Sequence, residues 1–316
     1  MTSGASTEES LRPTGPEPMA GWLCFLVGVA SAALGLLPWL VTGMRLPLQN
    51  LWAGATASGQ MPRVMLPFSQ YATTFIVGLI VTGAATAGVF ARAVRSRLPR
   101  PGFLALFLGV LAVQISAVLQ TEDVVRAGLQ DRRESALYLA ALVTGATLSV
   151  LLGALVLWLI ARAPRAGAVV GLSIAAVAAG PWLSGLLFPW GAVSSGDVGW
   201  QLAVLHWVRP VLVGAAVAWG GINTVGRVVA AAAGLVLLWV GSALTTAIAS
   251  AAGTRVLARD PAAMLQYGTE VFAAALTTPG VAWPPVGVAV VVAAVGLVGR
   301  RLTPRRSTGR DADLVP

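Results

Sequence analysis

Eight stretches of apolar residues, separated by polar connections, fill most of this chain. They lie near residues 21–42, 67–91, 102–120, 137–162, 167–189, 205–225, 228–251 and 283–300. A helix needs about 20 predominantly apolar residues to cross the hydrocarbon core of a bilayer, and backbone polar groups are satisfied there only in helices or closed barrels. Because no stretch carries a carboxylate in its interior, the pattern predicts an all-α fold, a polytopic transmembrane helical bundle of eight spans.

The composition supports this class. Hydrophobic residues make up 57% of the chain and charged residues 10%, whereas soluble domains carry about 25% charged residues. The length alone would suggest two soluble domains. Spans that pack against one another and against lipid instead form one continuous bundle.

Arginines are divided unequally between the two sides that these spans define. One side collects Arg92, Arg95, Arg97, Arg100, Arg162, Arg165, Arg227, Arg300, Arg301, Arg305, Arg306 and Arg310. The other side has fewer arginines, in longer connections that also carry most of the carboxylates. Since cytoplasmic loops carry the excess of Lys and Arg, both termini are predicted to be cytoplasmic. The lysine-free, Ala- and Gly-rich composition is typical of a GC-rich genome, and we expect a bacterial cytoplasmic membrane.

The net charge of +9 raises the question of a nucleic-acid partner. Nucleic-acid binding requires cations gathered on one accessible face, and these arginines lie on both sides of the membrane. We therefore expect no nucleic acid. The partners that the pattern indicates are membrane lipids and other membrane or envelope proteins.

The chain divides into two halves of four spans. The halves cover residues 20–165 and 166–302, between predicted disordered cytoplasmic tails at 1–19 and 303–316, the second of them basic. Since each half has an even number of spans, the halves share one orientation. They are predicted to be parallel repeats about an axis along the membrane normal, as in some transporters.

Short motifs carry this prediction of an internal repeat. Leu-Pro-Trp-Leu at 37–40 corresponds to Gly-Pro-Trp-Leu at 180–183, each at the end of an Ala- and Gly-rich span. Ser-Ala-Val at 116–118 corresponds to Ser-Ala-Leu at 242–244. Each half also ends on a basic segment that contains a proline.

His206 and Arg209 are the first candidates for binding chemistry. They lie three residues apart at the outer mouth of the sixth span, so on a helix they share a face and could receive an anionic head group or carboxylate. The alternative is an interfacial aromatic beside an arginine that extends its charge to the interface. Pro210 would then stand in an early turn, where its missing N–H costs little.

A second set of candidates comprises polar residues inside the spans. They are Gln114, Ser242, Thr245 and Thr246. Such groups could line a polar pathway between the halves. Alternatively they bond across helices or back to their own backbone, which contributes roughly 0.6 to 2 kcal/mol per interhelical bond.

Enzyme signatures are largely missing from the sequence. A metal site needs several convergent His, Cys, Asp or Glu ligands, and the chain has one histidine and one cysteine, Cys24. We expect no metal, no cofactor and no catalytic residues. An enzyme would require the outer carboxylates to converge in one cleft, namely Glu122, Asp123, Asp131 and Glu134. No ionisable residue stands near the centre of a predicted span, which argues against a proton-driven carrier.

The segment 261–278 mixes apolar residues with Gln266, Thr269 and Glu270. It reads either as an amphipathic helix on the outer leaflet or as a segment packed over the bundle.

These observations favour a non-catalytic accessory or scaffold subunit that acts through its extracytoplasmic loops. The alternative is a transporter or lipid-handling protein with a polar path between its two halves. A lipid-open or water-filled cavity that touches the polar candidates would favour the alternative, and a tightly packed centre would favour the scaffold.

Overall fold

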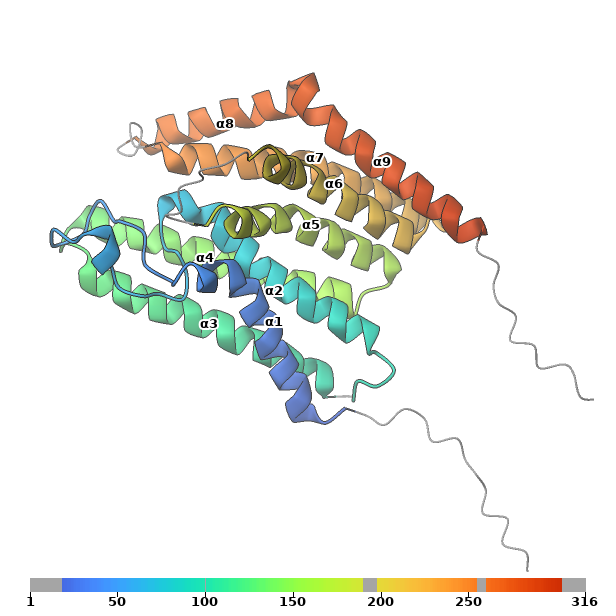
Figure 1. Ribbon diagram of the computed structural model, residues 1–316, viewed down its shortest axis with the longest axis horizontal. Helices are drawn as coiled ribbons and strands as arrows, with labels where there is room; N and C mark the ends of the chain where they lie inside the picture. Colours follow the sequence, from blue (N-terminus) through green and yellow to red (C-terminus); the bar gives the residue numbers. More distant parts are fainter. Residues whose placement is uncertain (1–18, 100, 190–197, 255–259, 303–316) are drawn as a thin grey trace, which may run out of the picture.

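The computed structural model describes residues 19–99, 101–189, 198–254 and 260–302, and its long elements are all α-helices (Figure 1). They are α1 (Gly21–Val41), α2 (Thr73–Ala93), α3 (Gly102–Gly128), α4 (Arg133–Ala161), α5 (Arg165–Leu187), α6 (Gly199–Gly220), α7 (Val225–Gly253), α8 (Pro261–Thr277) and α9 (Pro279–Leu302). Two single 3-10 turns occur at Ser58–Gln60 and Gln70–Ala72. Apart from Met19, the predicted tails lie outside the described residues.

Eight of these helices, all except α8, are long and apolar enough to cross a membrane. The predicted all-α class is confirmed, and the chain is a multi-pass membrane protein. Several helices run past the predicted spans, since α3 continues to Gly128 and α6 begins at Gly199. Hydropathy detects the apolar part of a helix, whereas its backbone hydrogen bonding continues through polar turns at either end.

A sharp break separates α6 from α7. Gly221 adopts a φ of +75°, a left-handed conformation that glycine reaches without the cost imposed by a Cβ. Its N–H donates to the carbonyl of Val217 at 2.9 Å, and α7 then begins at Val225. The structure therefore divides the helices near the boundary between the apolar stretches at 205–225 and 228–251.

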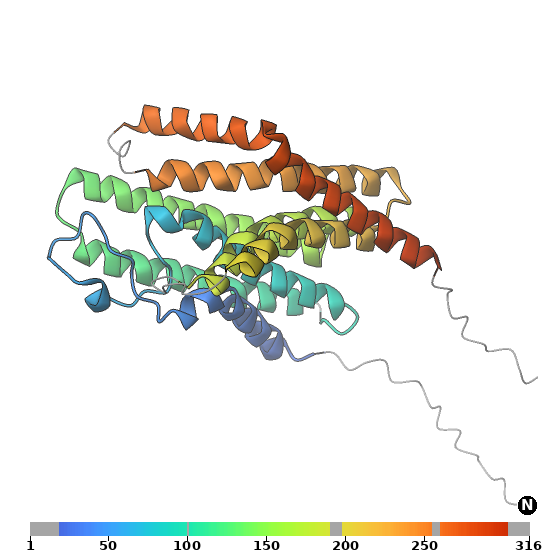
Figure 2. The ribbon, with the colours of Figure 1, turned by 45° about the horizontal axis from the view of Figure 1, so that its top comes forward.

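The segment predicted at 261–278 forms α8, which packs along α7 (Figures 1 and 2). The Asp260 carboxylate accepts a hydrogen bond from the N–H of Ala263 at 3.0 Å and so caps the helix. At the far end, the Trp239 indole of α7 donates to the carbonyl of Leu276 at 3.3 Å. Of the two interpretations of this segment, the arrangement favours the one packed on the bundle.

The first half is held together by close approach of its helices. Its most extensive contact joins α2 to α4, followed by α1 with α3 and α1 with α2. Gly35 and Gly83 bring the backbones of α1 and α2 together, since a Cβ on Gly35 would lie 2.6 Å from the Cα of Gly83. Small residues of this kind permit tight helix packing within a membrane.

The second half follows the same order of helix contacts. Its most extensive contact joins α6 to α9, followed by α5 with α7 and α5 with α6. If α1, α2, α3 and α4 are set against α5, α6, α7 and α9, the three leading contacts of the two halves correspond one to one.

Arginines at one end of the molecule cap the most extensively packed helix pairs. Arg92, in the last turn of α2, donates to the carbonyls of Ile160 and Ala163 beyond the end of α4 at 2.5 and 3.1 Å. Arg300, in the last turn of α9, donates to the carbonyl of Ala218 near the end of α6 at 2.5 Å. Helix C-termini leave carbonyls unsatisfied and favour positive charge, so each contact stabilises a helix end and joins it to its neighbour.

The two halves meet along α5, which contacts α1, α2 and α4. A Cβ on Gly78 of α2 would lie 2.9 Å from the backbone nitrogen of Trp182, and the Trp182 indole donates to the carbonyl of Gly35 at 2.8 Å. A closed two-fold arrangement would require equally extensive contact between α1 and α6. Among the described residues no comparable contact joins those helices, so the halves pack side by side without a two-fold axis.

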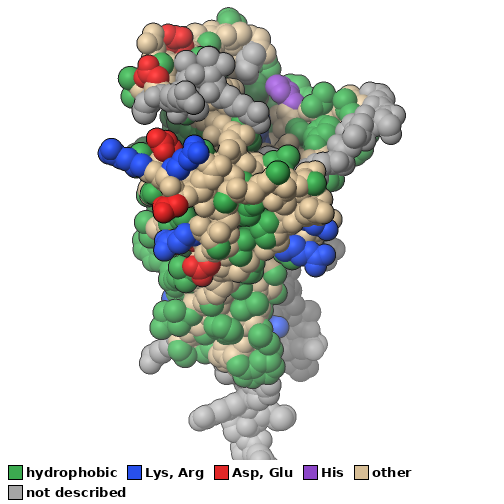
Figure 3. Space-filling model, turned by 90° about the vertical axis from the view of Figure 1, so that its left-hand side faces the viewer, with side chains coloured by type: hydrophobic (Ala, Val, Ile, Leu, Met, Phe, Trp, Pro, Cys, Tyr) green, Lys and Arg blue, Asp and Glu red, His purple; other side chains and the backbone are tan. Residues whose placement is uncertain are grey.

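Residues 43–72 form an ordered cap over the other end of the first half. Gln49 donates to the carbonyl of Phe68 and accepts from the Tyr138 hydroxyl, both at 2.8 Å. The Thr121 hydroxyl accepts from the N–H of Leu66 at 3.0 Å. Figure 3 faces this end of the molecule, where acidic and basic side chains lie among one another.

Candidate functional site

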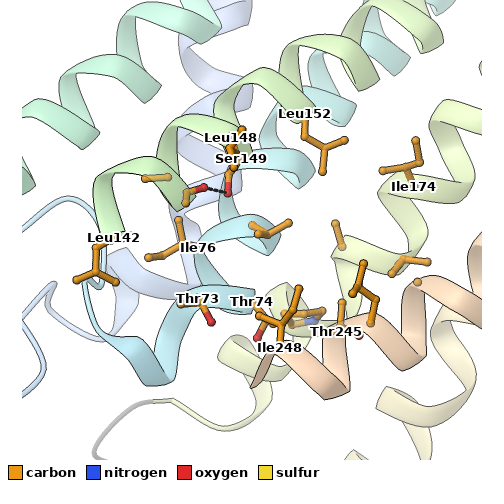
Figure 4. A pocket seen from close by; sticks show the side chains of 18 of the residues that line it. Thr73, Thr74, Ile76, Leu142, Leu148, Ser149, Leu152, Ile174, Thr245 and Ile248 are labelled. Atoms are coloured by element: carbon orange, nitrogen blue, oxygen red, sulfur yellow. Dashed lines mark hydrogen bonds between the residues drawn. The ribbon is translucent and has the colours of Figure 1, made fainter. Parts of the chain in front are cut away.

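An apolar groove of about 560 Å³ lies between the two halves, walled by α2, α4, α5 and α7. Figure 4 shows Leu148 and Leu152 of α4 across the groove from Thr74 and Thr245. Leu148 is 59% exposed and Ile248 43% exposed, so the rim of the groove lies on the outer surface of the bundle. In a bilayer that surface meets lipid, and a groove lined in this way suits a hydrocarbon chain.

A polar cavity of about 470 Å³ adjoins the groove. Thr74, Pro181 and Thr245 line both spaces, so the two spaces lie next to each other at these residues. The polar residues of the second cavity are Tyr71, Thr74, Ser184, Arg209, Thr245, Thr246 and Ser250. Its lining is thus rich in hydroxyl groups, and among the described residues that line it Arg209 is the charged one.

Arg209 lies half-way along α6, as the eleventh of its 22 residues. The apolar pattern predicts Arg209 near the start of a span that begins at about 205, whereas the helix itself begins six residues earlier, at Gly199. An ionisable side chain thus lies at the midpoint of a helix that is long and apolar enough to cross a membrane. A charged residue within a membrane helix is costly and commonly marks a functional site.

The Arg209 side chain lies across α5 and reaches α7. A Cβ on Gly180 would lie 2.8 Å from Cδ and 3.2 Å from Nε of Arg209. The guanidinium Nη1 donates to Oγ of Ser242 at 3.3 Å. The stem thus occupies space that a larger residue at position 180 would fill, and the charge is held beside the polar cavity.

A smaller cavity of about 100 Å³ lies on the other side of Arg209, between α6, α7, α8 and α9. His206 and Arg209 both line it, so the predicted common helix face is confirmed. The His206 ring is exposed and meets the Trp207 ring edge to face at 4.4 Å. Pro210 stands in the middle of α6 and not in an early turn, and it provides no N–H for the carbonyl of His206.

Ser242, Thr245 and Thr246 lie together on α7 at this site. The hydroxyls of Thr245 and Thr246 donate to the carbonyl of Ser242 at 2.8 and 3.0 Å. The donors are therefore used within the helix, as the backbone-bonding interpretation predicts. Their oxygen lone pairs remain available on residues that line the polar cavity.

Gln114 does not join the other candidates. It is buried within the first half, where its amide donates to the carbonyl of Ile80 at 2.9 Å and joins α3 to α2. It lines none of the three cavities described above. The structure therefore brings together five of the six predicted polar residues and leaves Gln114 in a packing role.

Known proteins provide no template for this site. No family model, curated protein or solved structure matches the chain. Within the described residues, no group of three or more His, Cys, Asp or Glu side chains is placed to hold a metal ion. Cys24 is fully buried in α1.

The four carboxylates near the turn between α3 and α4 converge only in part. Glu122 and Asp131 line a depression of about 760 Å³ at the turn between α3 and α4, whereas Asp123 and Glu134 are not part of its lining. Glu122 forms an ion pair with Arg126 one helical turn away. This pair is local, within α3.

Sequence reasoning missed the contribution of α2 and α5 to the site. Thr73 and Thr74 line the groove, and the Thr73 hydroxyl is buried without a hydrogen-bond partner. Ser184 adds a hydroxyl from α5 to the polar cavity. The available signal is the pair of adjacent threonines at the polar edge of the second span, but hydropathy does not say whether such residues face lipid or a cavity.

Proposed function

We propose that this protein is a lipid-handling membrane protein that binds an amphiphile between its two four-helix halves. A single observation carries the proposal, namely the apolar groove and the polar cavity that share Thr74, Pro181 and Thr245. A hydrocarbon chain fits the first space and a hydrated head group fits the second. The cavity between the halves favours this function over the accessory subunit that the sequence alone favours.

The proposed placement in the membrane has eight spans, with both termini in the cytoplasm of a bacterium. The capping arginines Arg92 and Arg300 stand in the last turns of α2 and α9. These helices end at the same end of the bundle at which the described chain begins and ends (Figure 1). Since cytoplasmic segments carry the arginine excess, this end faces the cytosol. The polar cavity and the cap of residues 43–72 then lie toward the exterior.

The proposed internal repeat relates residues 20–165 to residues 166–302. Its support is the matching order of helix contacts in the two halves. The Pro-Trp pairs at 38–39 and 181–182 occupy corresponding places in α1 and α5.

The proposal is tested by filling the groove. Gly145 lines the groove, and a Cβ at this position would meet no atom within 4 Å. Gly145→Leu should therefore fold normally and obstruct the hydrocarbon site. Gly287→Leu is the matched control, because Gly287 also has open space around its Cβ position and lines none of the cavities between the halves.

The measurement is native mass spectrometry of the full chain, purified in mild detergent and supplied with phospholipids. The wild type and Gly287→Leu should retain bound lipid, and Gly145→Leu should lose most of it. A wild-type protein that retains no lipid, or a Gly145→Leu variant that binds as well as the control, would overturn the proposed function.

An accessory subunit remains the second candidate, and the ordered outer cap favours it. Trp52 of the cap lies directly against Gly128 of α3, and the N–H of Ala53 donates to the carbonyl of Gly128 at 2.9 Å. These contacts give residues 43–72 a defined surface that another envelope protein could contact. Capture of one specific envelope protein by the wild type, and its loss when the cap is exchanged, would support this function.

A further inference from the structure

Arg209 lies half-way along an apolar helix, and no acidic side chain among the described residues neutralises its charge. The hydrogen bond found for its guanidinium is to the neutral hydroxyl of Ser242 at 3.3 Å. In the described part of the chain the ion pair found is Arg126–Glu122, far from this site at the turn between α3 and α4. Removing a charge from water without an opposite charge costs several kcal/mol, so this position gains stability from an anion.

The Arg209 side chain does not extend toward the membrane–water interface, where its charge would be hydrated. An arginine near a helix end places its charge among the head groups by stretching its stem along the helix. The stem of Arg209 instead crosses over Gly180 toward α7. Because Gly180 has no side chain, the guanidinium stays within the bundle, between the polar cavity and the smaller cavity that it also lines.

The surroundings of the guanidinium suit the head group of a lipid better than a free ion. The polar cavity supplies hydroxyls from α2, α5 and α7 around a single positive charge. The apolar groove adjoins it at Thr74 and Thr245. A small anion would leave the groove unused, whereas an amphiphile occupies both spaces.

We propose that Arg209 binds the anionic group, phosphate or carboxylate, of an amphiphile whose hydrocarbon chain lies in the apolar groove. The inference rests on the proposed function and adds the charge and the contact of the head group. Guanidinium forms paired, charge-assisted hydrogen bonds with such oxyanions. The hydroxyls of Thr245, Thr246 and Ser250 are placed to contact the remaining polar atoms.

The test compares phosphatidylglycerol with phosphatidylcholine of identical acyl chains, binding to the full-length protein in detergent. The wild type should prefer the anionic lipid by roughly tenfold or more, as expected for a hydrogen-bonded charge. Arg209→Gln should abolish this preference and still bind both lipids. The matched control is Arg165→Gln, which removes an exposed arginine at the start of α5 outside the cavities.

Two further measurements complete the test. Arg209→Lys keeps a positive charge and should retain part of the preference, which allows the test to proceed if the glutamine variant fails to fold. Soluble glycerol 3-phosphate should compete poorly with the lipid, because it lacks the chain that occupies the groove.

Each outcome decides between the proposals. Equal binding of the two lipids by the wild type, or a preference that survives Arg209→Gln, overturns this inference and leaves lipid binding in place. Competition by glycerol 3-phosphate as strong as that by the lipid shows a site for free anions and also overturns it. If the wild type binds neither lipid, the proposed function itself is overturned.

Discussion

Gly180 of α5 and Arg209 of α6 form a matched pair, in which the missing side chain of one provides the space for the stem of the other. A Cβ on Gly180 would lie 2.8 Å from Cδ of Arg209. The pair sets the direction of the guanidinium, which donates to Ser242 on α7. Three helices of the second half therefore meet at one charged side chain.

Gly180→Ala should weaken anionic lipid binding with little loss of stability. The new methyl group displaces the flexible arginine stem and moves the guanidinium away from Ser242. Alanine is also favoured over glycine in a helix by about 1 kcal/mol, which offsets part of the strain. Thermal unfolding and lipid binding should be compared with Gly287→Ala, and unchanged lipid preference in Gly180→Ala would show that the pair does not position the charge.

Arg92→Gln should destabilise the end of the first half at which α2 ends. It removes two hydrogen bonds to the end of α4 and a contact between the guanidinium and the Trp219 ring, whose centroid lies 5.0 Å away. Loss of a charged hydrogen bond costs about 1.5–3 kcal/mol, so the melting temperature should fall. Arg95→Gln removes the same charge from an exposed position and should unfold like the wild type.

Gly83→Leu should prevent α1 and α2 from packing. A Cβ on Gly83 would lie 3.0 Å from the carbonyl oxygen of Ser31 and 3.1 Å from the Cα of Ala32. Backbone atoms cannot move aside as a side chain can, and overpacking costs about 1–3 kcal/mol or more. Gly226→Leu, which meets no atom within 4 Å at its Cβ, should express and unfold normally. Equal yields and melting temperatures of the two variants would contradict the close approach.

The proposed topology predicts opposite labelling of two exposed positions. Replacing Cys24, the sole cysteine, by alanine gives a background free of thiols. In intact cells, a membrane-impermeant maleimide should react with Ala55→Cys in the outer cap. It should react with Ser96→Cys only after permeabilisation, because Ser96 lies in the link between α2 and α3. The reverse pattern would invert the proposed orientation.

Much of the fold could be predicted because the bilayer dictates it. Long apolar stretches must form helices in lipid, and all eight predicted stretches are helical. The break near Gly221 could also be predicted, because glycines and polar residues interrupt the apolar pattern there. The position of a residue along a span gives its depth in the membrane. The sequence therefore predicts that Ser242, Thr245 and Thr246 lie at a similar depth.

The neighbours of each residue could not be predicted in the same way. The depth of Gln114 along its span fits a central path. Its helix α3, however, lies in the first half, away from the interface that α5 forms between the halves. The sequence of a single apolar span does not indicate which face of its helix packs against which neighbouring helix. The sequence does not predict that Arg209 lies half-way along α6, because the first turn of this helix, with Trp200 and Gln201, resembles a polar connection.

Among the described residues, the interface that α5 forms between the two halves occurs once. Two halves related by a closed two-fold axis would present a matching pair of clefts, whereas the side-by-side packing observed here offers one. A titration of the purified chain should therefore saturate at a single equivalent of amphiphile per polypeptide. Because the packing is asymmetric, Arg209 serves a single cleft. The face of α1 that packs against no helix of the second half can then contact bulk lipid.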